Sequence, residues 1–389
     1  MHCKPRGTGQ ILKVVFVCIL MILVLSKYAN AKVSGVCSNC HTMHNSQNGS
    51  NMRLDYSKAQ ISGSGAGECL DCHAETRAVL LQLDCLGCHA TNPSGGANIV
   101  GGWPQVAHNA GTDLAGGNYR NVFGGNNTRG HNVHGFGAAV GSDFFLANTP
   151  PGYNSSFDPA STKYDTVKRL QCAGSNGCHG NRNQVSPILA IRGTHHADDS
   201  MLKFGAGFRE STQGDPASTG NAGTSYRFLY KVHGAEDSDW EATLTATDHN
   251  EYKGGTFASR PVGSMQWSDV NTISEFCAEC HGIFHEGGNS GIGSASPWLR
   301  HPTDVILPSS GEYTAYTAYN TEAPVARQNI ADGTTQALGT VAPGTDIVMC
   351  LSCHRAHASP YPDILRWDYS NMGKGRGCYI CHTQKDDNL

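Results

Sequence analysis

One continuous apolar segment stands out in a largely polar chain, and it lies near the N-terminus. It covers residues 14–25 and follows a positively charged stretch over residues 4–13. Ala29-Asn30-Ala31 then supplies the small-x-small pattern of a signal-peptidase site. The pattern predicts a signal peptide over residues 1–31 and a mature chain that begins at Lys32. The alternative is a retained membrane anchor, which the short apolar run disfavours.

Beyond the leader, regular hydrophobic periodicity is scarce. Residues 92–154 are rich in Gly, Asn, Ser and Thr, which favour turns and loops. Residues 226–232 have the pattern of a strand, and residues 241–247 are expected to pair with them. The intervening loop carries three acidic side chains: Glu236, Asp237 and Asp239. We interpret it as a solvated loop, with calcium binding as the alternative.

Composition strengthens the expectation of little regular structure. The 389 residues include 47 Gly, and only 39% are apolar and 8% aromatic, so core-forming side chains are few. We therefore predict a mostly coil fold with short helices and few strands, in one elongated unit over residues 32–389. Removing the leader takes away four of the 28 basic residues and leaves 24 against 32 acidic ones, a formal charge of −8. Such a charge disfavours nucleic acid as a partner and suits cationic or metal-ion partners.

Cysteine pairs supply a candidate for what fills the interior. Six pairs are spaced C-x-x-C-H: Cys37/Cys40/His41, Cys69/Cys72/His73, Cys85/Cys88/His89, Cys277/Cys280/His281, Cys350/Cys353/His354 and Cys378/Cys381/His382. This spacing is the attachment signature of c-type haem. Two thioether bonds fix one edge of the porphyrin, and the next residue, His, ligates the iron. Disulfides, zinc sites and redox dithiols also use paired cysteines. Six motifs with His always in the same place favour haem.

A seventh pair has a longer spacing, Cys172-x5-Cys178-His179. His179 follows Cys178 directly, as in the other six motifs, and Gly174 and Gly177 would let the longer loop bulge outward. We predict haem attachment here too, which makes seven c-type haems. The alternative is a disulfide between Cys172 and Cys178.

Seven irons need seven sixth ligands, and histidine is abundant enough to provide them. Of the 19 His, seven are proximal and one leaves with the leader, so 11 remain. The predicted sixth ligands are His44, His131, His196, His249, His285, His301 and His357. His195 is the alternative to its neighbour His196, and we expect His108, His134 and His233 to be spare. Methionine, the other common sixth ligand, shows no repeated relation to the motifs.

Three predicted sixth ligands closely follow a proximal histidine: His44 after His41, His285 after His281 and His357 after His354. On a helical turn, offsets of three or four place both side chains on one face. The two axial ligands of one iron must approach from opposite sides of the porphyrin. Each of these histidines is therefore expected to bind a different, neighbouring haem or none. A bound one would tie two porphyrins together.

Four parts of the chain carry a more specific pattern. They are Cys37-Ser-Asn-Cys40-His41-Thr-Met-His44-Asn-Ser, Gly130-His131-Asn132, Phe276-Cys277-Ala-Glu-Cys280-His281 with His285 and Leu299-Arg300-His301-Pro302, and Cys350-Leu-Ser-Cys353-His354-Arg-Ala-His357-Ala-Ser. Together they resemble the outer-surface cytochrome S type, the filament-forming multihaem cytochromes of metal-reducing bacteria. The resemblance covers both ends and scattered motifs, and most of the middle is not matched.

The resemblance implies a mostly coil chain wrapped around a continuous row of bis-His haems, which polymerises head to tail. It also implies that His44 ligates the haem at Cys350/Cys353 of a neighbouring, identical subunit. That type carries six haems, whereas this chain offers seven, and Cys172-x5-Cys178 replaces a normal motif.

The expected function is extracellular electron transfer from a secreted or outer-surface position, toward other cytochromes, metal oxides or other acceptors. One alternative is a monomeric periplasmic or outer-membrane shuttle that uses His44 within its own chain. The other is a multihaem reductase of the nitrite, hydroxylamine or tetrathionate type. Catalysis needs an iron with an open coordination site, which nitrite-reducing architectures often mark with C-x-x-C-K, and that motif does not occur here. We do not expect an enzyme.

Overall fold

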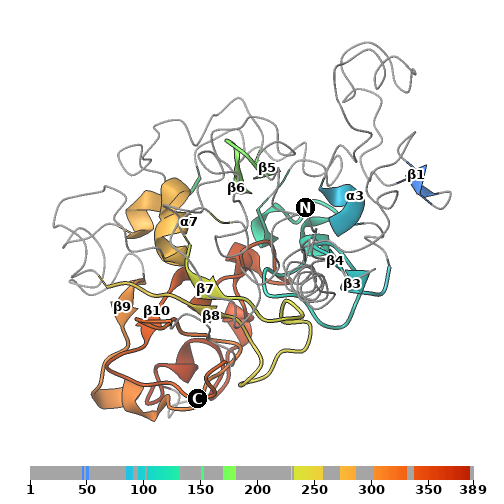
Figure 1. The fold of residues 1–389 in the computed structure, drawn as a ribbon. Coiled ribbons are helices and arrows are strands. Elements are labelled where there is room, and N and C mark those ends of the chain that lie inside the picture. Colours follow the sequence, from blue (N-terminus) through green and yellow to red (C-terminus); the bar gives the residue numbers. More distant parts are fainter. Residues whose placement is uncertain are drawn as a thin grey trace, which may run out of the picture.

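The computed structural model describes residues 46–47, 50–51, 85–90, 95–100, 103–131, 133, 150–152, 170–180, 229, 232–256, 272–285, 301–330 and 337–385. Over these residues the chain is mostly coil, as the composition predicts (Figure 1). Its α-helices are α3 (Leu86–His89) and α7 (Ile273–His281). Its 3₁₀ turns are η3 (Tyr119–Val122), η4 (Asn127–Arg129), η11 (Gly282–His285), η12 (Gly311–Ala315), η13 (Cys350–Ser352), η14 (Pro362–Ile364), η15 (Tyr369–Asn371) and η16 (Gly377–Ile380).

The strands are two or three residues long and form isolated two-stranded pairs. Four pairs are antiparallel: β1 (Ser46–Gln47) with β2 (Ser50–Asn51), β3 (Ile99–Val100) with β4 (Trp103–Pro104), β7 (Gly234–Ala235) with β8 (Glu251–Tyr252), and β9 (Val305–Ile306) with β10 (Ile347–Val348). β5 (Gln171–Ala173) and β6 (Gly177–His179) pair in parallel. In the register, Ile347 faces Ile306 and Tyr252 faces Gly234.

The described C-x-x-C-H motifs lie on short helical elements. α3, α7, η13 and η16 each contain motif residues. α7 begins where the Thr272 side chain accepts a hydrogen bond from the Glu275 backbone nitrogen (3.0 Å), a typical N-cap. The helix ends at the motif residue His281. A short helical turn therefore presents the histidine one residue beyond its second cysteine.

The longer motif folds differently from the other described motifs. Its residues before and after a tight turn lie side by side as the strands β5 and β6. Gln171 lies opposite Gly177, and Ala173 lies opposite His179. Gly174 adopts φ +87°, a conformation that disfavours other residues. A Cβ at Gly177 would lie 2.6 Å from the Ala173 backbone, so this close approach requires glycine. The two glycines therefore shape the loop.

The predicted strand over residues 241–247 is wrong. Trp240 and Glu241 have positive φ (59° and 65°), and the following residues form turns in which Thr245 bridges Asp248. Of the proposed partner strand, Leu229 forms an isolated bridge with His179. The remaining residues through 231 lie outside the described ranges. β7 and β8 pair instead, and they enclose the longer segment of residues 236–250.

Two of the three acidic side chains of the loop are buried, which is contrary to our interpretation of a solvated loop. Glu236 and Asp237 are 6% and 5% exposed. The Asp237 backbone nitrogen donates to Asn250 Oδ1, and Asp237 Oδ2 accepts from the Glu241 backbone nitrogen (both 2.8 Å). The polar side chains turn inward because they satisfy the backbone of a tight turn.

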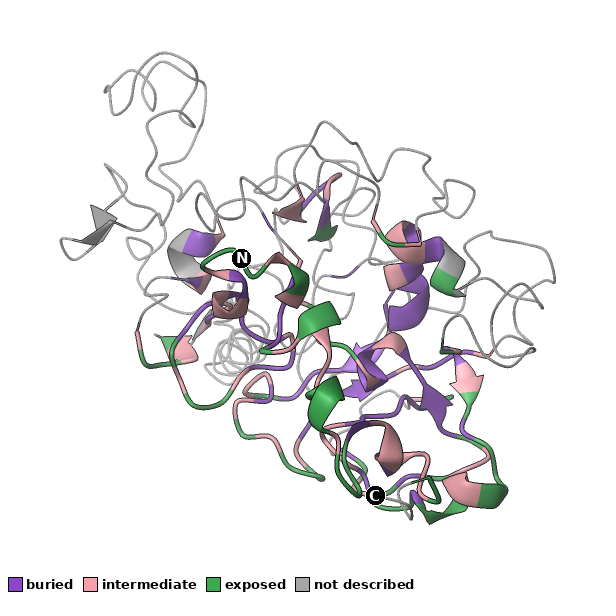
Figure 2. Cartoon of the chain, turned by 180° about the vertical axis from the view of Figure 1, so that it is seen from behind, coloured by how far each residue is buried: buried purple, intermediate pink, exposed green. Residues whose placement is uncertain are grey.

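Among the residues that the structure describes, the buried apolar side chains form three small clusters. Figure 2 shows buried residues in several parts of the chain. Each cluster is bordered by a cysteine from a different Cys–His motif: Cys277, Cys172 and Cys381. Ala358 joins distant parts of the chain, because it forms bridges with both Gly117 and Gly130. The C-terminal segment is thereby brought against residues 103–131 (Figure 1).

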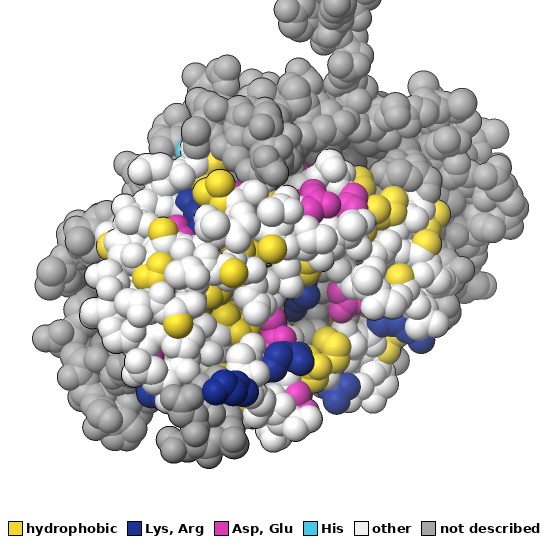
Figure 3. Space-filling model, turned by 90° about the horizontal axis from the view of Figure 1, so that it is seen from below, with side chains coloured by type: hydrophobic (Ala, Val, Ile, Leu, Met, Phe, Trp, Pro, Cys, Tyr) yellow, Lys and Arg dark blue, Asp and Glu magenta, His cyan; other side chains and the backbone are white. Residues whose placement is uncertain are grey.

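On the face seen in Figure 3, Lys and Arg side chains are interspersed with Asp and Glu. Among the residues that the structure describes, no helix is long and apolar enough to cross a membrane.

Candidate haem-binding sites

The candidate ligand histidines share a way of fixing their rings. In seven of them Nδ1 contacts an oxygen acceptor: His89 to Pro104 O (2.8 Å), His131 to Ala356 O (2.8 Å), His249 to Thr245 O (3.2 Å), His281 to Pro151 O (2.7 Å), His301 to Pro302 O (2.8 Å), His354 to Asp363 O (2.8 Å) and His382 to Glu312 Oε1 (3.0 Å). Carbonyl and carboxylate oxygens only accept, so Nδ1 carries the hydrogen. Nε2 is then the nitrogen suited to a metal, and the hydrogen bond orients the ring.

In each of three pairs of histidines, the centroids of the two rings are separated by nearly the same distance. The ring centroids are 6.1 Å apart for His131 and His281, 6.2 Å for His179 and His357, and 6.2 Å for His301 and His382. Each pair combines one motif histidine with one predicted sixth ligand. Two imidazoles bound on opposite sides of one metal, at metal–nitrogen distances of about 2 Å, would place their ring centroids about 6 Å apart. The side chains therefore fit a bis-His haem at these three motifs.

Burial favours the neutral, metal-binding form of these rings. Burial, together with the nearby His131, lowers the pKa of His281 to about 4. Burial likewise lowers the pKa of His131, His301 and His354 below the ordinary value. A neutral imidazole is the form that ligates metals.

Residues 353–358 take part in three sites at once. His354 belongs to its own motif, and the Ala356 carbonyl orients His131, which faces His281. His357 faces His179 of the longer motif, 178 residues earlier in the sequence. One short segment thus brings the His179, His281 and His354 motifs together.

The ring of His357 is held from two directions. Tyr119 stacks on it, with centroids 5.0 Å apart and planes 20° from parallel. Gly116 passes close to it, because its carbonyl accepts from the His357 backbone nitrogen at 2.7 Å. Tyr119 also lies near the cysteines of the longer motif. Burial, and then the charges of Cys172 and Cys178, raise its pKa well above the ordinary value.

Cysteines of successive motifs lie beside one another. The Cys277 and Cys350 side chains hydrogen-bond to each other, and Ser274 Oγ accepts from the Cys350 backbone nitrogen at 3.0 Å. α7 is therefore docked on η13. Burial, followed by the charges of Cys381 and Cys378, raises the pKa of Cys353 to about 12. The last three motifs form a connected series.

Two other histidines have different surroundings. His108 is completely buried, and its Nδ1 accepts from the Ala110 backbone nitrogen at 3.2 Å, so the hydrogen sits on Nε2. Nε2 lies 4.0 Å from Asp113 Oδ1. A histidine with its hydrogen on Nε2 cannot ligate a metal through that nitrogen, so His108 differs from the candidate ligands above.

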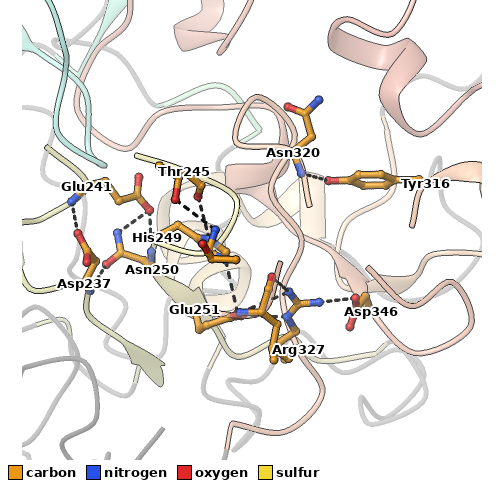
Figure 4. A network of polar contacts seen from close by, with 12 residues as sticks. Asp237, Glu241, Thr245, His249, Asn250, Glu251, Tyr316, Asn320, Arg327 and Asp346 are labelled. Carbon is orange, nitrogen blue, oxygen red and sulfur yellow. Dashed lines mark hydrogen bonds and ion pairs between the residues drawn. The ribbon is translucent and has the colours of Figure 1, made fainter. Parts of the chain in front are cut away.

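His249, a predicted iron ligand, lies in a buried polar network (Figure 4). Its ring stacks on Tyr319 at 3.6 Å, and its Nε2 is 3.5 Å from Glu251 Oε1. Glu251 Oε2 pairs with Arg327 at 2.9 Å, and Arg327 also pairs with Asp346. Nδ1 of His249 contacts the Thr245 carbonyl at 3.2 Å, as in the other candidate ligands, so His249 differs from them in the Glu251 carboxylate beside its Nε2.

Many of the cysteines and histidines considered in the sequence fall outside the described residues: Cys37, Cys40, His41, His44, Cys69, Cys72, His73, the expected spare His134, and His196 with its alternative His195. The side chains of Cys88 and His285 also lie outside the part of the chain that the structure describes. Within the described ranges, no group of three or more His, Cys, Asp and Glu side chains is arranged to hold a metal ion.

Sequence reasoning missed three residues that fix the ligands: Gly116, Tyr119 and Glu312. They lie 241, 238 and 70 positions from the histidines that they contact. The paired glycines at 116 and 117 were the only local signal, because tight turns and close approaches call for glycine.

Comparison with known proteins gives one family match. Residues 342–387 match the doubled CXXCH motif, and this range contains the Cys350/Cys353/His354 and Cys378/Cys381/His382 motifs. No curated protein matches the chain.

Two solved structures are similar. One is the outer membrane cytochrome S filament from Geobacter sulfurreducens, with a TM-score of 0.41 and 20% identity over 88% of this chain and 86% of that chain. The other is a cryo-EM structure of OmcS nanowires from Geobacter sulfurreducens, with a TM-score of 0.42 and 18% identity over 89% and 86%.

Proposed function

We propose that this protein is a secreted multihaem c-type cytochrome that transfers electrons outside the cell. The observation that carries the proposal is the recurring separation of 6.1–6.2 Å between a motif histidine and a second histidine, at three motifs. A bound haem supplies an iron that changes reversibly between two oxidation states. The protein attaches it, holds both imidazoles and keeps water from the porphyrin. We propose seven such haems, including one at Cys172/Cys178.

The shared segment supports transfer between sites. Electron transfer slows steeply with separation, so a conductor needs its redox groups in contact. Residues 353–358 serve the motifs of His179, His281 and His354, and Cys353 lies near Cys381 of the next motif. We therefore propose that these four sites follow one another as a continuous row, ending at the His382 motif.

The distal ligand of the Cys350/Cys353 haem is proposed to come from another copy. Among the described residues, no histidine ring faces His354 at the separation seen in the other pairs. The family resemblance suggests His44 of a neighbouring subunit. We propose head-to-tail filaments on this basis. Other cytochromes and extracellular metal oxides or similar acceptors are the proposed partners.

His249 is proposed to be structural rather than a ligand. The stacked Tyr319 ring and the Glu251 carboxylate beside Nε2 support this reassignment. The opposite tautomer of His108 supports its assignment as a spare histidine.

The test is the intact mass of the mature, secreted protein together with its spectrum. Seven haem additions, low-spin spectra and no carbon monoxide binding after reduction are expected. A colourless protein, or one whose motif cysteines are joined as disulfides, would refute the proposal. The variant His44→Ala distinguishes a filament subunit from a monomeric electron shuttle. A filament protein should lose assembly, whereas a shuttle should stay monodisperse with one perturbed haem.

A further inference from the structure

The last Cys–His motif differs from the other described motifs in what its histidine contacts. His89, His281 and His354 each hydrogen-bond through Nδ1 to a backbone carbonyl. His382 instead contacts a carboxylate, Glu312 Oε1, at 3.0 Å. A carbonyl is neutral and a carboxylate carries a full charge, so the two acceptors act differently on the imidazole.

The fold holds Glu312 in this position. Glu312 lies in η12 and its carbonyl accepts a hydrogen bond from Thr383 Oγ1, which fixes the turn against the residue after His382. The side chains of Glu312 and His382 are each only 14% exposed. The Tyr313 ring packs edge-on against His382, with centroids 5.2 Å apart. The contact is therefore built into the packing.

The Glu312 carboxylate has a second charged neighbour besides the His382 ring. Lys385 Nζ is 3.7 Å from Glu312 Oε1, but it is 64% exposed, so solvent weakens its competing effect.

We propose that Glu312 lowers the reduction potential of the haem held at Cys378/Cys381 by making His382 a stronger electron donor. This inference rests on the proposed function. Two effects have the same sign. A hydrogen bond to a carboxylate raises the basicity of a ligating imidazole, which favours the oxidised iron. The negative charge also favours the oxidised state, because that state is more positive by one unit.

The lowered potential gives the row of haem sites a direction for electron flow. The His382 motif stands at one end of the proposed series, next to Cys353. A lowered potential there makes this site give up electrons to its neighbours more readily than it would without Glu312. Glu312 is a positioning and tuning residue, since it acts through His382.

The experiment is a spectroelectrochemical titration of the full, haem-loaded protein with Glu312→Gln. Glutamine keeps an oxygen acceptor for Nδ1 but removes the charge. One component of the titration should move to higher potential, while haem number and the low-spin spectrum stay unchanged. The matched control is Asp368→Asn, which removes one negative charge from the same part of the chain. Its side chain caps η15 by accepting from the Ser370 backbone nitrogen, and asparagine can also cap.

The control should leave every component in place. A Glu312→Gln protein with full haem content and no upward shift would overturn the inference, as would an equal shift in the control. Lys385→Gln is a second test, because removing the competing cation should move the same component downward. An upward shift there would count against the inference. Peptide mass showing no haem at Cys378/Cys381 in the unmodified protein would instead refute the proposed function at this motif, and this inference with it.

Discussion

The contact between Gly116 and His357 allows a sharp test of the ligand assignment. A Cβ placed on Gly116 would lie 2.6 Å from Nδ1 and 2.8 Å from Cε1 of His357. Ordinary van der Waals contact begins near 3.4 Å, so Gly116→Ala requires the ring or the backbone to move by about 0.8 Å.

This displacement is large on the scale of metal coordination. Metal–ligand distances are held to within about 0.2 Å. Tyr119, stacked on the same ring at 5.0 Å, limits where the imidazole can go. We therefore expect His357 to leave the iron of the Cys172/Cys178 haem, with His179 still attached.

The assay is the spectrum and carbon monoxide binding of the reduced, secreted variant, with haem number measured by mass. Gly116→Ala should retain every haem and gain a high-spin, carbon-monoxide-binding signal equivalent to about one haem per chain. Gly111→Ala is the matched control, because a Cβ there meets nothing within 4 Å. An unchanged low-spin spectrum in Gly116→Ala would refute the assignment of His357.

Three further predictions concern the buried polar groups. Arg327→Met leaves the carboxylates of Glu251 and Asp346 buried without their cation, and should lower the free energy of unfolding by about 3–5 kcal/mol in chemical denaturation. His249→Gln should keep the haem number and the low-spin spectrum while reducing stability; a new high-spin haem would restore His249 as a ligand. Burial lowers the pKa of His108, so the unfolded chain takes up its proton first as pH falls below about 6.5. Stability should then fall by up to about 1.4 kcal/mol per pH unit, and His108→Gln should show a smaller loss between pH 7 and 5.5.

The sequence predicts the attachment motifs and the coil-rich fold because both depend on local chemistry. Two cysteines and a histidine in one turn are readable wherever they occur, and glycine-rich segments form few regular elements. The prediction of a strand over residues 241–247 was wrong because the conformation there depends on a side-chain contact with a residue outside the segment. Glu241 bonds to Asn250 through its side chain and adopts positive φ, which no strand pattern in the sequence reveals.

The pairing of histidines could not be predicted for the same reason. His131 and His281 lie 150 positions apart, and their approach depends on the carbonyl of Ala356, a residue with no chemical signature. His249 has the polar, turn-like setting of a ligand in sequence. In the fold its Nε2 meets Glu251, which is two residues away. This nearby carboxylate is the sequence feature that favours the proposed structural role, and the His249→Gln variant tests it.

The most direct test of the account is a density map of the assembled protein that locates the irons. An iron should lie midway between the rings of each of the three pairs, His131–His281, His179–His357 and His301–His382, about 3 Å from both centroids. A map that placed no iron between these rings, or that joined the motif cysteines to one another, would contradict it.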